Sequence, residues 1–148
     1  RYQSLKKAEI PMVKLENEAG FVRIIAGQFK HVMGPALTHT PITVLDVELQ
    51  AGQQAAFPAQ SGETALVYLR SGRAQFHKDE DVLEEQGLAV MSNQGEHFSI
   101  TALQNCKLLI LTGQPIAEPI NGHGPFVMNT YDEILQAYDD IKNGRFAK

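Results

Sequence analysis

Short apolar runs separated by turn residues fill most of this chain, and no other sequence feature limits its fold as strongly. The runs lie at residues 21–26, 42–49, 64–69, 73–77, 88–92, 97–102 and 107–111. Glycine marks most of the turns between them, often beside Ser, Gln or Pro. Many short strands at such spacing are typical of an antiparallel β-sandwich or β-barrel. We therefore predict an all-β core.

Alternation within the run 97–102 indicates which of its side chains face that core. Successive side chains of a strand point to opposite faces of the sheet. Phe98, Ile100 and Ala102 are therefore predicted to point inward, and His97 outward. The runs 64–70 and 107–111 differ, because they carry apolar residues on both faces, which predicts that a second sheet covers one face and a further element the other.

Length and charge exclude several classes of protein. The 148 residues suit one domain with a sizeable core. A formal net charge of −4, with no Lys/Arg cluster beyond Lys6 and Lys7, argues against direct nucleic-acid binding. We find no signal peptide and no membrane-spanning run. The one cysteine, Cys106, lies in an apolar run, so we predict a buried strand residue in a protein of the reducing cytoplasm.

The chain divides into three expected segments. Residues 1–19 are polar and irregular and are predicted to form a linker or N-terminal arm, and residues 20–112 the β-barrel. Residues 113–148 are predicted to form an extended strap followed by one α-helix. Because the chain opens at Arg1 with a linker-like segment, we expect a further domain upstream of it.

The expected helix has a clear beginning and end. Thr130 is the predicted N-cap, and Glu133 three residues later completes a capping box. Gly144 suits the left-handed position that ends a helix. The apolar residues at helical spacing on one face are Ile134, Ala137, Tyr138 and Ile141.

Two glycine-framed segments resemble the paired motifs of the cupin barrel, at residues 52–72 and 87–98. In that pattern two His and a carboxylate of the first motif, with one His of the second, bind a divalent transition metal. This chain has Pro58 and Gln60 at the positions of the two His, and Phe98 at the position of the third. We therefore expect Pro58, Gln60 and Phe98 to replace the ligands in the barrel interior, with no catalytic and no metal-binding residues in this chain.

One alternative metal site stays open at this point. It would consist of Gln60, Glu63 and His97. His97 lies one residue before the expected ligand position, so its side chain is predicted on the opposite face of the strand. The three side chains could meet only if a β-bulge resets the register of the second motif. The other histidines show no ligand spacing. The acidic residues Asp79, Glu80, Asp81, Glu84 and Glu85 are predicted to form a solvated loop.

The tail carries a resemblance specific to one family. Residues 113–120 lead into Gly124-Pro125-Phe126-Val127-Met128-Asn129-Thr130, then Glu133-Ile134 and Asn143-Gly144-Arg145-Phe146. This segment is similar to the C-terminal signature of the pirin family, and the resemblance covers nearly the whole chain. Its structural or interface residues are Pro119, Pro125, Phe126, Met128, Asn129, Thr130 and Glu133.

The resemblance implies a fold and a function. Pirins are bicupins whose N-terminal barrel binds iron and whose second barrel usually binds no metal. It implies a cupin or jelly-roll barrel with a C-terminal strap, the non-metal half of a protein similar to an iron-dependent quercetin 2,3-dioxygenase. This chain alone is then not expected to be an enzyme. Iron is expected in an N-terminal cupin domain, and that domain is the expected partner of this chain. Where that domain is absent, the chain is expected to be able to form a homodimer.

Two other functions stay open from the sequence. The first is a non-catalytic binding or transcriptional co-regulator module. The second is a barrel that holds an apolar small molecule, lined by Phe76 and Phe98, where the metal of other cupins lies.

Overall fold

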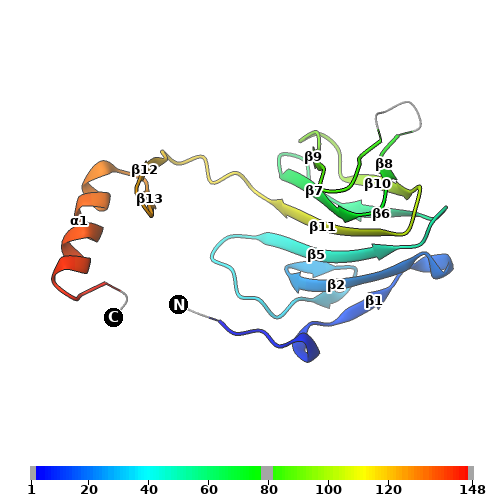
Figure 1. Cartoon of the computed structure of the whole chain (residues 1–148), viewed down its shortest axis with the longest axis horizontal. Coiled ribbons are helices and arrows are strands. Elements are labelled where there is room, and N and C mark those ends of the chain that lie inside the picture. The colour runs from blue at the N-terminus through cyan, green and yellow to red at the C-terminus, as the bar shows by residue number, and fades with distance from the viewer. Residues whose placement is uncertain (1–2, 78–81, 147–148) are drawn as a thin grey trace. The chain divides into compact units, whose positions relative to one another are not determined.

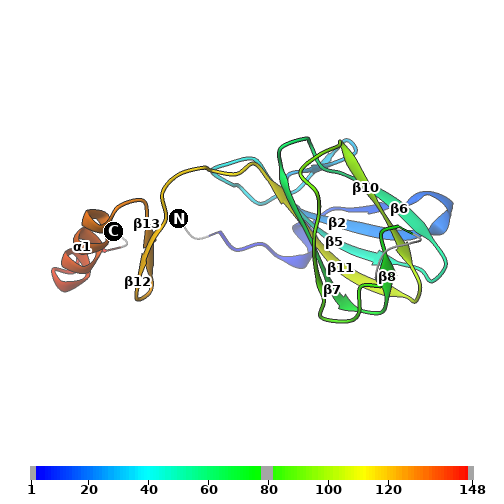
Figure 2. The ribbon, with the colours of Figure 1, turned by 90° about the horizontal axis from the view of Figure 1, so that it is seen from above.

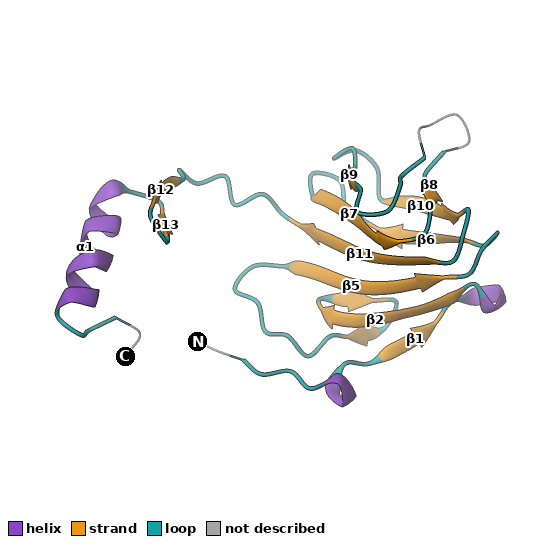
Figure 3. Cartoon of the chain, viewed as in Figure 1, coloured by secondary structure: helices purple, strands orange, loops and turns teal. Residues whose placement is uncertain are grey.

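The computed structural model describes residues 3–77 and 82–146 and divides the chain into two compact units (Figure 1). Unit 1 comprises residues 1–115 and unit 2 residues 116–148. Strands dominate unit 1, whereas unit 2 holds the α-helix (Figure 3).

A six-stranded antiparallel sheet forms one layer of unit 1. Its strands, in spatial order, are β1 (Met12–Lys14), β2 (Gly20–Ala26), β5 (Ile42–Leu49), β11 (Cys106–Gly113), β7 (Thr64–Ser71) and β9 (Leu88–Val90). The sequence-distant β5 and β11 lie side by side at its centre. The sheet therefore depends on contacts between residues about sixty positions apart in the chain.

A three-stranded antiparallel sheet forms the second layer. It is ordered β6 (Gln54–Pro58), β10 (His97–Ala102) and β8 (Ala74–Gln75), and Figure 2 shows it beside one face of the larger sheet. The remaining elements of unit 1 are the hairpin of β3 (Gln28–Phe29) and β4 (Val32–Met33) and two 3₁₀ turns, η1 (Lys7–Glu9) and η2 (Glu16–Glu18). This antiparallel two-sheet architecture is that of the predicted all-β cupin fold.

Strict alternation of buried side chains builds the core between the two sheets. In β11, Cys106, Leu108, Ile110 and Thr112 are buried, whereas the residues between them are not. The fully buried core residues come from both layers: Val22, Ile24, Leu45, Val47, Val67, Leu69, Leu108 and Ile110 from the larger sheet, with Phe57, Ala74, Ile100 and Ala102 from the smaller one. The burial of apolar surface from both sheets holds unit 1 together.

Three phenyl rings extend this core at one place. Phe57 lies directly opposite Phe98 in the β6–β10 register, so both side chains share a face. The Phe57 ring centroid is 6.0 Å from that of Phe98 and 5.9 Å from that of Phe29. These tilted contacts fill the space between the smaller sheet and the β3–β4 hairpin.

Unit 2 is a hairpin packed on a helix. The hairpin pairs β12 (Asn121–His123) with β13 (Phe126–Met128), and α1 (Tyr131–Lys142) follows. Its buried residues are Phe126, Ile134 and Ala137, with Met128 packed against them. Within the described residues, no helix is both long and apolar enough to cross a membrane.

The predicted caps of α1 are confirmed. The Thr130 hydroxyl accepts a hydrogen bond from the Glu133 N–H, and the Glu133 carboxylate accepts one from the Thr130 N–H at 2.8 Å. Gly144 adopts a φ of 64°, in the left-handed region. On the predicted apolar face, Ile134 and Ala137 are buried, but Tyr138 and Ile141 stay exposed.

The structure differs from the sequence prediction in three segments. Residues 12–14, expected in an irregular arm, form the edge strand β1, because Val13 packs on the core. Residues 54–58 form β6, which was not predicted because the Gln and Ala residues before Pro58 are not typical of a strand. The expected extended strap contains the β12–β13 hairpin, whose turn holds Gly124 at a φ of 56°.

The Phe57 ring should be the most costly single deletion in unit 1. Its side chain is 0% exposed and contacts two other rings, so Phe57→Ala removes apolar burial and leaves a cavity. We expect a loss of about 3–5 kcal/mol in the free energy of unfolding, measured by urea denaturation of the full chain. The matched control on the same strand is Gln54→Ala, an exposed position expected to change that energy by less than about 0.5 kcal/mol. A loss below about 1 kcal/mol for Phe57→Ala would contradict the packing described above.

The capping box of α1 should make helix order sensitive to acid. Hydrogen bonds from the backbone and hydroxyl of Thr130, and from the Asn129 N–H, lower the pKa of Glu133. A lowered pKa means that this stabilisation is present above the pKa of an unfolded glutamate and is lost as pH falls through the folded value. We expect an NMR titration to place the Glu133 midpoint below that of an unfolded peptide, and Thr130→Val to raise it. A wild-type midpoint at or above the peptide value would show that the box does not form.

Candidate functional site

A pocket of about 500 Å³ opens at one end of the two-sheet layer, and we call it the mouth pocket. Its walls include Thr43 at the start of β5 and Thr112 near the end of β11, which lie opposite each other and project from the inner face of the larger sheet. Pro58, Gln60 and Glu63 also line the pocket. The pocket lining thus includes Pro58 and Gln60, the two residues of the first motif that were predicted to replace His ligands.

Pro58 and Gln60 do not fill the interior as expected. Both side chains are exposed, although both line the mouth pocket. The reason is strand parity: Phe57 takes the buried position in β6, so Pro58 lies on the other face, opposite His97. Gln60 lies beyond the end of β6 in a turn, where its N–H donates to the Glu63 carboxylate at 2.9 Å.

Phe98 lies on the interior face of β10 and packs against the core, together with Ile100 and Ala102. His97 is exposed on the opposite face. The β6–β10 register runs without a shift from His97 to Thr101, so the bulge that the alternative site of Gln60, Glu63 and His97 required does not occur.

The donor set does not fit a transition metal. The three positions that correspond to cupin His ligands carry a pyrrolidine ring, an amide and a phenyl ring, and such sites need imidazole or carboxylate donors. Across residues 3–77 and 82–146, no three His, Cys, Asp or Glu side chains lie close enough to hold a metal ion. We therefore derive no chemical step through a metal in this chain.

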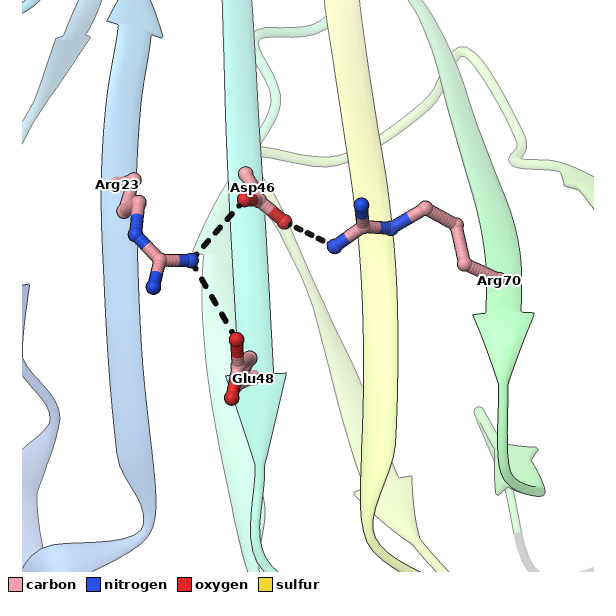
Figure 4. Close-up of polar contacts among 4 residues, drawn as sticks. All are labelled: Arg23, Asp46, Glu48 and Arg70. Atoms are coloured by element: carbon pink, nitrogen blue, oxygen red, sulfur yellow. Dashed lines mark hydrogen bonds and ion pairs between the residues drawn. The ribbon is translucent and has the colours of Figure 1, made fainter. Parts of the chain in front are cut away.

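A second polar cluster lies on the outer face of the larger sheet (Figure 4). One nitrogen of the Arg23 guanidinium lies 3.1 Å from the Asp46 carboxylate and 3.4 Å from that of Glu48, and Arg70 contacts the other oxygen of Asp46. Arg23 also lies over the Phe21 ring, 4.6 Å from its centroid. Since each carboxylate already has a cationic partner, this cluster ties β2, β5 and β7 together rather than offering a reactive group.

The N-terminal segment borders the same outer face. Leu5, Lys7 and Ile10 line a cavity of about 470 Å³ together with Arg23 and Arg70. The Gln3 side chain fastens this segment, because it donates to the Pro35 carbonyl and accepts from the Leu37 N–H, each at 2.9 Å. The further element expected over the second face of the sheet is thus, in part, the chain's own N-terminal segment.

The surroundings of Cys106 disfavour a thiolate. It is buried, as predicted, and its S–H donates to the carbonyl oxygens of Arg73 and Gln104 at 3.0 and 3.1 Å. Burial raises the pKa of the Cys106 thiol, which reduces the thiolate needed for nucleophilic attack.

The expected acidic loop is only partly described. Asp79, Glu80 and Asp81 lie outside the described residues. Glu84 is exposed and forms a two-pronged ion pair with Arg73, whose guanidinium lowers the pKa of that carboxyl. This pair anchors a loop end to the neighbouring strand region and involves no buried carboxylate of the kind that acid–base catalysis needs.

The hydrogen bonds and ring contacts described for the signature residues of the tail lie within unit 2. Asn129 donates through its side chain to Glu118, and its carbonyl accepts from the Asn121 side chain at 2.6 Å. The Phe126 ring contacts Tyr138 edge to face, with centroids 5.0 Å apart. Pro119 and Pro125 are exposed. The arrangement stabilises a small folded unit.

Comparisons with known proteins agree with this picture. The family model of the Pirin C-terminal cupin domain matches residues 44–147. A Pseudomonas aeruginosa protein, named provisionally as a quercetin 2,3-dioxygenase, is 40% identical over the whole of this chain, which covers 51% of that protein. Human Pirin is 32% identical over 98% of this chain and is covered to 50%.

A solved structure is also similar to this chain over its full length. The crystal structure of quercetin 2,3-dioxygenase from Acinetobacter baumannii superposes on the whole chain with a TM-score of 0.91 at 38% identity, and this chain covers 51% of it. The chain thus spans about half the length of the relatives that it matches.

Proposed function

Because this chain belongs to the pirin family, as a C-terminal cupin domain, we propose that it is the half of a two-barrel protein that holds no metal. The intact protein is proposed to resemble an iron-dependent quercetin 2,3-dioxygenase, with the iron in an N-terminal cupin domain. The observation that carries this proposal is the phenyl ring of Phe98 on the interior face of β10, where a metal-binding cupin has an imidazole.

In this proposal, the chain acts through shape and packing. Its sandwich has a continuous apolar core, so it is suited to stiffen a neighbouring barrel and to form one wall of a substrate cleft. We also propose a cytoplasmic location, because a chain with the single cysteine Cys106 has no internal disulfide that a reducing compartment would break.

Unit 2 supports the proposal of a docked partner domain. Among residues 116–146 it buries three apolar residues, and units of this size seldom fold alone without a disulfide, a metal or a partner. Its large apolar side chains stay exposed on the helix and beyond it: Tyr131, Leu135, Ile141 and Phe146. We propose that the N-terminal cupin domain covers these residues, and that a second copy of the chain covers them where that domain is absent.

A non-catalytic binding or transcriptional co-regulator module is the second candidate function. The same exposed residues of unit 2 favour it, since a binding module needs an apolar contact surface. The two candidates differ in what this surface contacts: an iron-bearing cupin domain in the first case, a regulatory protein in the second.

The purified chain should neither retain a transition metal nor turn over quercetin. We expect mass spectrometry of protein expressed in iron-supplemented medium to find iron, nickel, manganese and zinc far below one atom per chain, because the ligand positions lack imidazoles. The control is His97→Ala, which should leave the trace metal content unchanged. Stoichiometric metal in the wild type that is lost in His97→Ala would overturn the proposal.

Unit 2 should be less stable than unit 1 when the chain is alone. We expect the amides of α1 to exchange with deuterium much faster than those of β11, because Ile134 and Ala137 are the only buried residues of the helix. Adding the proposed N-terminal cupin domain should slow exchange in α1 and leave β11 unchanged. Protection of α1 that equals that of β11 in the monomeric chain would show that unit 2 needs no partner.

A further inference from the structure

The mouth pocket differs in chemistry from the apolar interior that lies beside it. Phe76 and Phe98, expected to line an apolar ligand cavity, instead pack against the core. The pocket has a volume of about 500 Å³, within the range of small-molecule sites. The described lining residues all belong to unit 1, so ligand binding in this pocket does not require the proposed partner domain.

The charged groups of the described pocket lining balance each other. Lys30 lines the pocket, and its ammonium group lies 3.0 Å from the Glu16 carboxylate. Glu63, the acidic residue among the described lining residues, accepts a hydrogen bond from the Gln60 N–H. The described lining thus holds one cation and one anion, so it carries no net charge and favours an uncharged ligand over an anion or a cation.

The uncharged polar groups of the pocket are of the kind that recognises hydroxyls. Thr43 and Thr112 each carry a hydroxyl that both donates and accepts, and Gln60 carries an amide that does the same. The two threonines lie opposite each other in the β5–β11 register, so their hydroxyls project from neighbouring strands of one face. The buried Phe29 ring and Pro58 add apolar walls against which the C–H face of a ring can pack.

From these features we infer that the mouth pocket binds an uncharged, hydroxyl-rich small molecule of the sugar or cyclic polyol class. The strand hydroxyls and the Gln60 amide exchange hydrogen bonds with ligand hydroxyls, and Phe29 and Pro58 contact its carbon skeleton. The site needs no metal, which agrees with the donor set of this chain.

NMR titration of the isotope-labelled full chain tests this inference. The probes are D-glucose, D-galactose, D-mannose and myo-inositol, with citrate as the anionic and quercetin as the planar aromatic comparison. We expect at least one of the four neutral probes to shift the amide signals of Phe29, Thr43 and Thr112. Thr43→Val and Thr112→Val should each weaken that binding about fivefold to tenfold, the effect of losing one hydrogen bond.

Two further variants separate an effect on ligand binding from an effect on folding. Gln60→Ala changes an exposed turn residue and should weaken binding without affecting the core, even where Thr112→Val disturbs folding. Thr101→Val, on β10 and outside the pocket lining, is the matched control and should bind as the wild type does. The inference is overturned if no neutral probe shifts these signals, if only citrate or quercetin binds, or if Thr43→Val and Gln60→Ala bind with wild-type affinity.

Discussion

The pairing of Phe57 directly opposite Phe98 in adjacent strands is the constraint on which the rest of unit 1 depends. Their register puts both rings on the interior side of the smaller sheet, where they fill the space toward Phe29. A slip of one residue would bring His97 and Pro58 inward and expose both rings, which would cost the burial of two large apolar side chains. The hydrophobic core thus fixes the register, and the register excludes the histidine from the interior.

The consequences of this register extend to the rest of unit 1. Because the interior is apolar, the polar groups at the cupin motif positions are confined to the mouth pocket at the end of the sandwich. The outer face of the larger sheet carries a compensated charge network centred on Asp46 (Figure 4). Half-buried ion pairs of this kind contribute little net stability, so the network's main effect is to fix the relative positions of β2, β5 and β7.

Sequence patterns predicted the elements whose signals are local. The apolar run at 42–49 and the apolar/polar alternation at 97–102 predicted the bounds of β5 and β10, and the capping box predicted the start of α1. β6 was missed because its Gln and Ala residues have low strand propensity and gain their place only by pairing with β10. The Arg23–Asp46–Arg70 network and the mouth pocket were also missed, since each joins residues far apart in the chain.

Anomalous X-ray diffraction at the iron absorption edge, from crystals of the chain grown with excess Fe(II), tests the central claim most directly. The parity of β10 predicts no anomalous peak between the two sheets, with the Phe57 and Phe98 rings in the density there. A peak in that space coordinated by His97 would show that the register differs from the one described and that this domain is a metal-binding cupin.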